Sequence, residues 1–305
     1  MHVAVLGAGS LGTLFAAKLR AAGVPVTLIG RPGGHLQAIE REGIRIHQTD
    51  ETVETVAVEV TADHTAVVDA DWLLLAVKSY DTASAMSDVA DHLDGTTVLT
   101  VQNGLGNAET IAEFVPPERV LVGTTAHGAS ILRAGHVHHA GAGETVIGRY
   151  DGDNGPEVDD IASTLTEAGI ETVVTDTPRD ALWEKVLVNV AINAATALAR
   201  VPNGHLVGYP AGERLVERAI EEALAVARAD GRSVGDEVLE TAKTVARETA
   251  PNRSSMLQDV EAGSQTEIES LNGAIVDRGE AMGIETPVNR TLADLVRLAE
   301  TLAED

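Results

Sequence analysis

Three polar side chains recur at every fourth residue inside an apolar stretch of the chain. They are Lys185, Asn189 and Asn193, and the residues around them up to Ala199 are mainly valine, leucine, isoleucine and alanine. Side chains four residues apart lie on one face of an α-helix, so we expect an ammonium group and two amides in a row on a helix that is buried on nearly all sides. Burying a lysine or an amide costs free energy unless it has a partner, so each of the three needs one.

Two hypotheses explain this polar row. In the first, the groups form a network between helices that only fixes the packing. In the second, they line a cleft and bind a small, oxygen-rich ligand. Hydride delivery to a ketone develops negative charge on its oxygen, and an ammonium group can stabilise that charge and donate the proton. Burial lowers the pKa of Lys185 toward the working pH, which suits an acid, and the amides can bind hydroxyl and carboxylate oxygens without adding charge.

The N-terminal residues have the pattern of a dinucleotide-binding site. The apolar run His2–Leu6 predicts a buried parallel strand, and Thr13–Ala22 predicts a helix. Between them stands a G-x-G-x-x-G motif, made by Gly7, Ala8, Gly9, Ser10, Leu11 and Gly12. The first glycine makes the tight turn, the second lets a pyrophosphate approach the backbone, and the third lets helix and strand pack closely. The helix N-terminus then faces the phosphate charge, so the motif predicts dinucleotide binding.

The residues after the second predicted strand bear on which dinucleotide binds. NAD sites usually have an acidic residue there that accepts a hydrogen bond from the ribose 2′-hydroxyl, whereas NADP sites favour a basic one. Here Val24–Ile29 is followed by Gly30, Arg31 and Pro32, with no carboxylate. Arg31 can clamp a 2′-phosphate, which favours NADP(H); the alternative is an exposed turn arginine without a role.

Two further polar residues follow predicted strands. Lys78 comes directly after Trp72–Val77, and Asn103 comes just past Val98–Val101. Ligands of open α/β sheets bind beyond the carboxyl ends of the strands, so both residues are candidate ligand contacts.

The rest of the chain reads as a sheet followed by helices. Further strands are predicted at residues 44–48, 53–60, 120–125, 145–148 and 170–175, with a helix at 158–168. From Thr177 onward the pattern predicts helices at 181–199, 212–229, 236–249, 265–282 and 287–303. The expected fold class is α/β, with a Rossmann-type doubly wound sheet in residues 1–176 and an all-helical domain in residues 177–305 that carries the polar row.

The composition excludes several classes of protein. The net charge is −25, from 47 acidic and 22 basic residues, and this acidic excess repels nucleic acid and anionic membranes. A carboxylate-rich surface with only four lysines suggests a halophilic protein, because high salt screens the repulsion. Without cysteine there is no thiolate nucleophile. No signal peptide and no membrane-spanning run is apparent, so we expect a soluble, cytoplasmic protein, with a homodimer as a candidate assembly.

One pair of histidines raises the question of a metal site. His136 and His138 would place two imidazoles on one face of a strand. No carboxylate or third ligand stands at a usable spacing, so we expect a polar strand face and no bound metal.

Several separate motifs follow one another along the chain. They are Gly7-Ala8-Gly9-Ser10-Leu11-Gly12; Lys78; Gln102-Asn103-Gly104; Gly123-Thr124-Thr125-Ala126-His127; Trp183-Glu184-Lys185 with Asn189 and Asn193; Pro202-Asn203-Gly204; Ser254-Ser255-Met256-Leu257-Gln258-Asp259; and Thr266-Glu267-Ile268. Each alone is unspecific. Together and in this order they make the chain, from Met1 to about Leu292, resemble the 2-dehydropantoate 2-reductase (ketopantoate reductase) family.

The resemblance implies NADPH-dependent reduction of 2-dehydropantoate to (R)-pantoate, on the route to pantothenate and coenzyme A, at a site between the two domains. It implies that Lys185 is the catalytic lysine and that Glu267 acts beside it, holding a substrate hydroxyl or orienting the lysine. The cofactor contacts that it implies, besides the glycine motif, are Arg31, Lys78, Asn103, Ala129 and Glu267. The substrate contacts that it implies are Asn103, Lys185, Asn189, Asn193, Asn203, Asn252 and Ser255.

Two alternatives remain. One is another NAD(P)-dependent dehydrogenase of the same architecture, acting on a different 2-keto or hydroxy acid or on a phosphorylated substrate. An arginine cluster near Asn203 would favour a phosphorylated substrate, and the sequence shows none. The other is a non-catalytic protein that senses NADP(H), which has no reason to align Lys185 with two amides or to retain Glu267.

Overall fold

The structure, a computed structural model, describes residues 1–301, and the chain divides into two compact units. The first unit comprises Met1–Gln102 and Asn107–Pro178. The second comprises Asn103–Gly106 and the chain from Arg179 onward. The predicted boundary after residue 176 placed Asn103–Gly106 in the first domain. In the structure this segment belongs to the second unit, although it follows a strand of the first.

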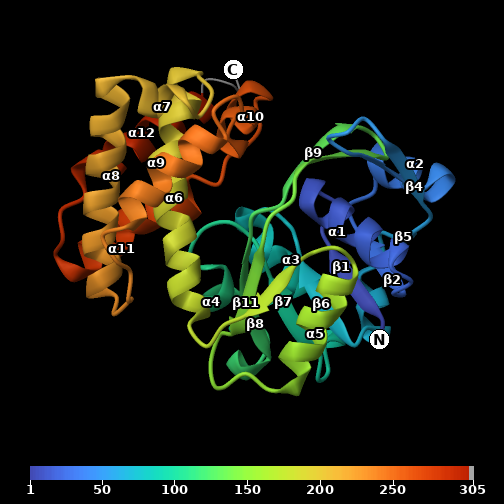
Figure 1. Ribbon diagram of the computed structural model, residues 1–305. Coiled ribbons are helices and arrows are strands. Elements are labelled where there is room, and N and C mark those ends of the chain that lie inside the picture. The colour runs from blue at the N-terminus through green and yellow to red at the C-terminus, as the bar shows by residue number, and fades with distance from the viewer. Residues whose placement is uncertain (302–305) are drawn as a thin grey trace. The chain divides into compact units, whose positions relative to one another are not determined.

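An eight-stranded sheet forms the centre of the first unit (Figure 1). Its spatial order is β12, β11, β8, β7, β6, β1, β2, β5. The bounds are β1 Val3–Leu6, β2 Val26–Ile29, β5 Glu59–Thr61, β6 Trp72–Leu75, β7 Thr97–Thr100, β8 Val120–Thr125, β11 Thr145–Arg149 and β12 Thr172–Val174. From β5 to β8 all neighbours are parallel, in the order that dinucleotide-binding folds use, while β11 is antiparallel to β8. The fold is therefore α/β with a Rossmann-type sheet.

The central strands form because their sequences are short apolar runs without polar alternation. β1, β2, β6 and β7 are buried at every residue, as expected for parallel strands that are covered on both faces. The strand order reverses beside β1, where the chain turns to β2 on one side and to β6 on the other. The ends of β1 and β6 therefore flank the point at which open α/β sheets bind their ligands.

Five α-helices belong to the first unit. They are α1 Ser10–Ala21, α2 Gly34–Glu42, α3 Thr82–Val89, α4 Asn107–Ile111 and α5 Pro156–Glu167. Short 3-10 turns lie at η1 His64–Asp69, η2 Ser79–Asp81, η3 Ala90–His92 and η4 Pro117–Arg119. Helix α1 buries most of its residues, Phe15 and Leu19 among them. It connects β1 to β2 and is therefore the first helix of the dinucleotide-binding fold.

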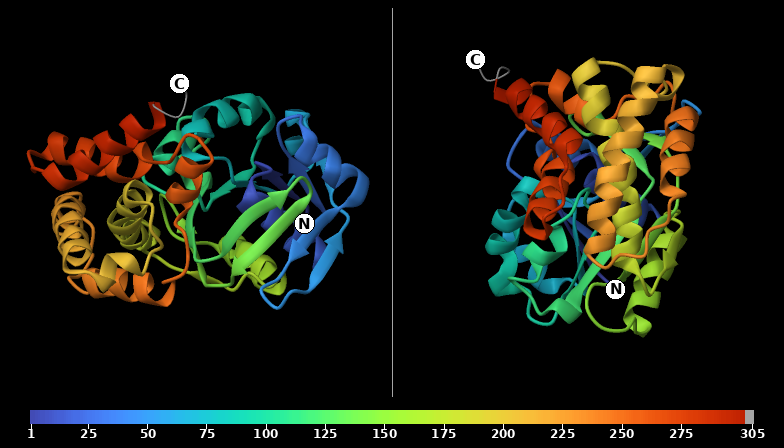
Figure 2. Two further views of the ribbon diagram at one scale, coloured as in Figure 1. Left: turned by 90° about the horizontal axis from the view of Figure 1, so that it is seen from above. Right: turned by 90° about the vertical axis from the view of Figure 1, so that its left-hand side faces the viewer.

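A second, four-stranded sheet lies in the same unit (Figure 2). It contains β3 Ile44–His47, β4 Val53–Val56, β9 Gly128–Arg133 and β10 His136–Gly141, in the order β4, β3, β10, β9. It packs against α1, which contacts β3, β4, β9 and β10. The prediction of one strand over 53–60 was wrong, because the chain changes sheets at Ala57 and Val58: β4 pairs with β3, whereas β5 pairs with β2.

Histidines pair across this second sheet. Nε2 of His47 lies 2.8 Å from Nδ1 of His136, and Nδ1 of His127 lies 3.0 Å from Nε2 of His139. The ladder has an irregularity between His136 and Val137. Each contact thus joins one histidine of β10 to a histidine of another segment, His136 to His47 and His139 to His127. Among residues 1–301 no group of three potential ligands is placed to hold a metal ion.

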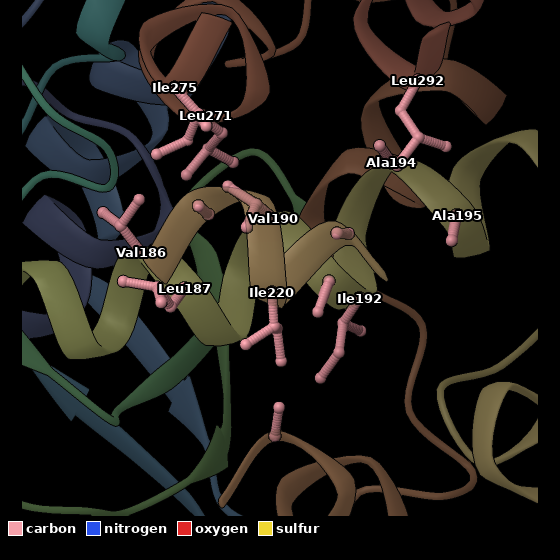
Figure 3. Packing of buried hydrophobic residues seen from close by; sticks show 14 of the residues in the cluster. Val186, Leu187, Val190, Ile192, Ala194, Ala195, Ile220, Leu271, Ile275 and Leu292 are labelled. Atoms are coloured by element: carbon pink, nitrogen blue, oxygen red, sulfur yellow. The ribbon is translucent and has the colours of Figure 1, made fainter. Parts of the chain in front are cut away.

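The second unit is helical. Its helices are α6 Pro178–Ala199, α7 His205–Gly208, α8 Pro210–Ala229, α9 Val238–Glu248, α10 Ser255–Glu261, α11 Ala274–Met282 and α12 Pro287–Thr301. Helix α6 is at the centre of its core: Val186, Leu187 and Val190 are fully buried, and they belong to one hydrophobic cluster with Ile220 and Leu271 (Figure 3). The predicted helix over 181–199 is confirmed, and the last residues of the helix predicted to end at 303 lie outside the described part.

A chain of polar contacts runs through this apolar core. The Glu222 carboxylate on α8 accepts hydrogen bonds from the backbone amides of Val288 and Asn289, the second at 3.0 Å, and so caps the N-terminus of α12. The Asn289 amide also donates to Glu222, at 3.0 Å, and its oxygen accepts from Asn272 at 3.0 Å. Asn272 in turn donates to the Val190 carbonyl of α6 at 3.2 Å. These contacts fasten α6, α8 and α12 to one another.

The predicted single helix over 265–282 was wrong. Its first part is irregular, and a π turn, η5 Glu269–Gly273, precedes α11. The Gly273 amide donates to the Ile268 carbonyl, five residues earlier, at 2.9 Å. A change of register of this kind depends on neighbouring segments, so the local apolar pattern does not reveal it. No helix within residues 1–301 is long and apolar enough to cross a membrane.

Candidate functional site

The glycine motif forms a tight turn between β1 and α1. Gly7 has a φ of +118°, and a Cβ at this position would lie 2.6 Å from the carbonyl carbon of Ala76, at the end of β6. A residue with a side chain is therefore excluded both by its conformation and by the neighbouring backbone. A Cβ on Gly12 would collide with the Gly7 carbonyl, so helix and turn approach closely. The predicted roles of these two glycines agree with this geometry.

The N-terminus of α1 is open. Gly9 occupies the N-cap position, no side chain caps the helix, and its first turn contains no acidic residue. Gly9 is exposed, and the nearest atom to a Cβ built on it lies 3.9 Å away. Uncapped amides and the helix dipole attract negative charge, and nothing at Gly9 blocks access to the backbone. The turn therefore fits the pyrophosphate of a dinucleotide.

The other predicted cofactor contacts of the first unit lie at strand ends or on β9. Arg31 follows β2; its side chain is 87% exposed, and one guanidinium nitrogen lies 3.4 Å from the Asp81 carboxylate. Lys78 is partly buried just beyond β6, before η2. Ala129 is partly buried on β9, paired with His139 of β10.

Gln102, which the sequence analysis quoted in a motif without giving it a role, holds the strand end at Lys78. The side-chain amide of Gln102 donates to the Val77 carbonyl at 2.8 Å and to the Thr82 hydroxyl at 2.9 Å. Its oxygen accepts from Thr100 at 2.9 Å. Gln102 thus ties the end of β7 to the residue before Lys78. The sequence could have indicated this role, because Gln102 stands directly after the predicted strand Val98–Val101.

Lys185 and Glu267 form the charged centre of the helical unit. Glu267 is buried, and Lys185 is partly buried on α6. Burial lowers the pKa of the Lys185 ammonium from 10.5 to about 8, and the nearby Glu267 carboxylate opposes that shift. A lysine with a pKa near 8 exchanges its proton close to neutral pH, which suits a general acid.

The two amides of the polar row are on the same helix. Asn193 is buried and Asn189 is partly buried, while Glu184 next to Lys185 is exposed. The expected burial of α6 is therefore confirmed for most of its surface. The row is less deeply buried at Lys185 and Asn189 than at Asn193.

A second amide group lies where α6 ends. The Asn203 side chain is buried; its nitrogen donates to the Thr249 hydroxyl at 2.9 Å, and its oxygen has no hydrogen-bond partner within the described chain. The Asn203 backbone amide donates to the Asn252 carbonyl at 3.0 Å. Asn252 and Ser255 are exposed, and the adjacent Ser254 caps α10 by accepting from the Leu257 amide at 3.1 Å. In the motif Ser254–Asp259, Ser254 therefore stabilises the start of α10, whereas Ser255 is accessible.

Asn103 is part of the helical unit. The segment Asn103–Gly106 follows β7, and the Leu105 amide donates to the Ser270 carbonyl at 2.8 Å. The Leu105 side chain belongs to the apolar core of the helices. The structure thus places Asn103 in the same unit as Lys185 and Glu267, whereas Arg31, Lys78 and Ala129 belong to the other unit.

Comparison with protein families decides the identity. The N-terminal ketopantoate reductase PanE/ApbA family matches residues 3–152, and the corresponding C-terminal family matches residues 178–300. The chain belongs to the ketopantoate reductase family. Both halves of the family are therefore present, and the residue positions quoted above from the motifs fall within them.

Known ketopantoate reductases resemble the chain over its whole length. A 2-dehydropantoate 2-reductase of Halobacterium salinarum is 52% identical over 300 residues, which cover 98% of this chain and 99% of that protein. The crystal structure of a PanE/ApbA family ketopantoate reductase from Ralstonia eutropha superposes with a TM-score of 0.92 at 38% identity, covering all of both chains. A ternary structure of D-mandelate dehydrogenase with NADH and anilino(oxo)acetate superposes with a TM-score of 0.95 at 25% identity, also over both entire chains.

Proposed function

We propose that the protein catalyses the NADPH-dependent reduction of 2-dehydropantoate to (R)-pantoate, in the biosynthesis of pantothenate and coenzyme A. The observation that carries this proposal is the 52% identity, over nearly the full length, to a 2-dehydropantoate 2-reductase. The pairing of a buried glutamate with a lysine of lowered pKa supports it, because the reaction needs a proton donor.

In this proposal Lys185 is the general acid. Its ammonium group stabilises the negative charge that develops on the ketone oxygen and donates the proton to it. Glu267 holds the lysine in place, and its charge raises the fraction of Lys185 that is protonated. The amides bind the carboxylate and hydroxyl oxygens of the substrate without changing the charge of the site. They are Asn103, Asn189, Asn193, Asn203 and Asn252, with the Ser255 hydroxyl.

The cofactor proposal concerns the first unit. When bound, a reduced nicotinamide dinucleotide supplies the hydride. The backbone from Gly7 to Gly12 binds the pyrophosphate, and Arg31 binds the 2′-phosphate that distinguishes NADPH from NADH. Lys78, Asn103, Ala129 and Glu267 are the further proposed contacts. The cytoplasmic location, the homodimer and the halophilic character stay predictions from the sequence.

A second candidate function is the reduction of another 2-keto acid. It is favoured by the likeness to D-mandelate dehydrogenase, whose name gives an aromatic 2-hydroxy acid as the compound that it oxidises and whose structure contains NADH and anilino(oxo)acetate. The same lysine and amides could serve such a substrate, because the ketone and the carboxylate are common to both. The size and polarity of the pocket around the remaining group on the keto carbon, which differs between the two substrates, would then decide the substrate specificity.

One assay separates these functions. NADPH and NADH oxidation would be followed with 2-dehydropantoate, phenylglyoxylate, pyruvate and 2-oxoisovalerate, each at low and at molar KCl. We expect the highest kcat/KM with 2-dehydropantoate and NADPH. A preference for phenylglyoxylate would support the second candidate, and cofactor binding without turnover of any 2-keto acid would support the non-catalytic sensing alternative.

A further inference from the structure

We propose that the π turn Glu269–Gly273 is the positioning element of the substrate site, holding Asn103, Glu267 and the polar row of α6 in register. The inference rests on the proposed function, because these are the residues to which that function assigns chemistry. It assigns roles to Ser270, Asn272 and Gly104, none of which touches the reacting atoms.

The first step concerns a backbone carbonyl. A π turn contains one residue more per turn than an α-helix, so the return to α-helical register leaves one carbonyl without its helical amide. Within η5 the Ser270 carbonyl accepts from the Leu105 amide, at 2.8 Å. The π turn thereby presents a hydrogen-bond acceptor to the segment Asn103–Gly106. An uninterrupted α-helix would have used this carbonyl internally.

The second step concerns the close fit at Gly104. This residue has a φ of +88°, and a Cβ built on it would lie 2.5 Å from the Ser270 carbonyl oxygen and would also collide with the Ser270 side chain. Gly104 therefore packs directly on the π turn. Because Asn103 is bonded to Gly104, this contact and the Leu105 hydrogen bond together set the position of its backbone.

The third step extends the π turn to the other site segments. The Ser270 hydroxyl donates to the Glu267 carbonyl at 3.1 Å, which fixes the backbone of the glutamate. Asn272, two residues further on, donates to the Val190 carbonyl of α6 at 3.2 Å. Val190 lies between the two amides of the polar row. One turn of five residues thus contacts three segments that carry proposed site groups, namely Asn103–Gly106, the backbone at Glu267 and helix α6.

A matched pair of glycine variants tests the proposal. Gly104→Ala and Gly106→Ala both force alanine into a left-handed conformation, with φ values of +88° and +93° in the parent. Only Gly104→Ala brings a Cβ against Ser270, because a Cβ on Gly106 has no heavy atom within 4 Å. The pair therefore separates loss of the π-turn contact from the backbone strain that both share.

The expected result is a difference in KM. Gly104→Ala should raise the KM for 2-dehydropantoate about tenfold or more relative to Gly106→Ala, as when a binding contact is displaced. Gly106→Ala should stay within about threefold of the parent. Equal KM values for two folded variants would overturn the proposal. If the parent prefers another 2-keto acid, the proposed function fails, and the comparison is made with that acid.

A milder variant gives a readout that does not depend on turnover. Ser270→Ala removes the hydroxyl that holds the Glu267 backbone, and Thr291→Ala removes a comparable hydroxyl–carbonyl bond at an exposed position of α12. The chain has only four lysines, so carbon-13 methylation resolves the titration of Lys185 by NMR. Ser270→Ala should shift the pKa of Lys185 downward, because the carboxylate that raises it is held less firmly. An unchanged Lys185 titration in Ser270→Ala would contradict the proposal, as would the same shift in Thr291→Ala.

Discussion

At the scale of single residues, Arg31 determines the proposed choice between NADPH and NADH. Its guanidinium is 87% exposed and 3.4 Å from the Asp81 carboxylate. Exposed ion pairs of this kind contribute at most about 1 kcal/mol, so Asp81 holds the arginine weakly. The side chain can therefore exchange this partner for a phosphate, which offers several strong acceptors.

Removing Arg31 should affect one cofactor selectively. We expect Arg31→Ala to raise the KM for NADPH by roughly tenfold or more, since a charge-assisted contact typically contributes about 1.5–3 kcal/mol. The KM for NADH should hardly change. Steady-state kinetics with both cofactors measure this, with Asp81→Asn as the control that keeps the arginine. A parent enzyme that prefers NADH would refute the assignment.

The amides of the polar row should act on substrate affinity. Asn189→Ala and Asn193→Ala should each raise the KM for 2-dehydropantoate by about fivefold to tenfold, with a smaller change in kcat, as expected for lost binding contacts. Asn193→Ala should also lower Tm more than Asn189→Ala, because Asn193 is the more buried of the two. Lower Tm values with unchanged KM would show that the row is only a packing network.

At the scale of elements, the four-stranded sheet contains a buried histidine pair. Nδ1 of His139 lies 3.0 Å from the Gln48 side-chain oxygen, so its Nε2 is left to accept from Nδ1 of His127. Nε2 of His127 is buried without a hydrogen-bond partner among the described residues. Burial, followed by the neighbouring His139 and Lys18, lowers the pKa of His127 from 6.5 to about 4. This pair is therefore neutral in the folded protein at pH 7.

The sheet should lose stability in mild acid. Between pH 6.5 and about 4, His127 is protonated in the unfolded chain but not in the folded chain. Its contribution to the free energy of unfolding is therefore fully present above pH 6.5 and decreases as the pH falls. The loss should be on the order of 3 kcal/mol, at about 1.4 kcal/mol for each pH unit between 6.5 and 4, and should stop below about pH 4. Denaturant unfolding of the parent and of His127→Gln across this range measures it, with the exposed His205→Gln as control. If His127→Gln keeps the full pH dependence of the parent, the histidine is not its source.

Elements differed in how far the sequence predicted them. Buried parallel strands and α6 were predicted because a local apolar run is enough to define them. Strands were expected at residues 44–48 and around His136, but their pairing in a second sheet was not predicted, because β3 and β10 are some ninety residues apart in the sequence. The π turn was missed for the same reason: the Leu105 amide that it binds comes from a distant part of the chain.

The sequence identified the candidate site residues, but it predicted less well which of them belong to the same structural unit. Lys185, Asn189 and Asn193 share a helix, so spacing alone predicts that they share a face. Asn103 follows a strand, and its sequence position predicts a place with the sheet. Its membership of the helical unit depends on Leu105 packing into the helical core, which local pattern cannot show.

At the scale of the whole molecule, we expect the net charge of −25 to determine how stability depends on salt. With 47 acidic and 22 basic residues, the folded chain repels itself in dilute buffer. We expect Tm and activity to rise with KCl into the molar range, because salt screens this repulsion. Thermal melts at increasing KCl test it, and a Tm that is equal or higher at low salt would remove the halophilic interpretation without affecting the enzyme.

The most direct test of the central claim is a comparison of Lys185→Ala with the parent in turnover and in Tm. If Lys185 is the general acid, kcat per folded molecule should fall by about 10²–10⁴-fold, while Tm and cofactor affinity change little. Lys243→Ala, which removes a lysine paired with Glu217 on the same unit, should leave kcat unchanged. A folded, cofactor-binding Lys185→Ala protein with nearly normal kcat would contradict the account.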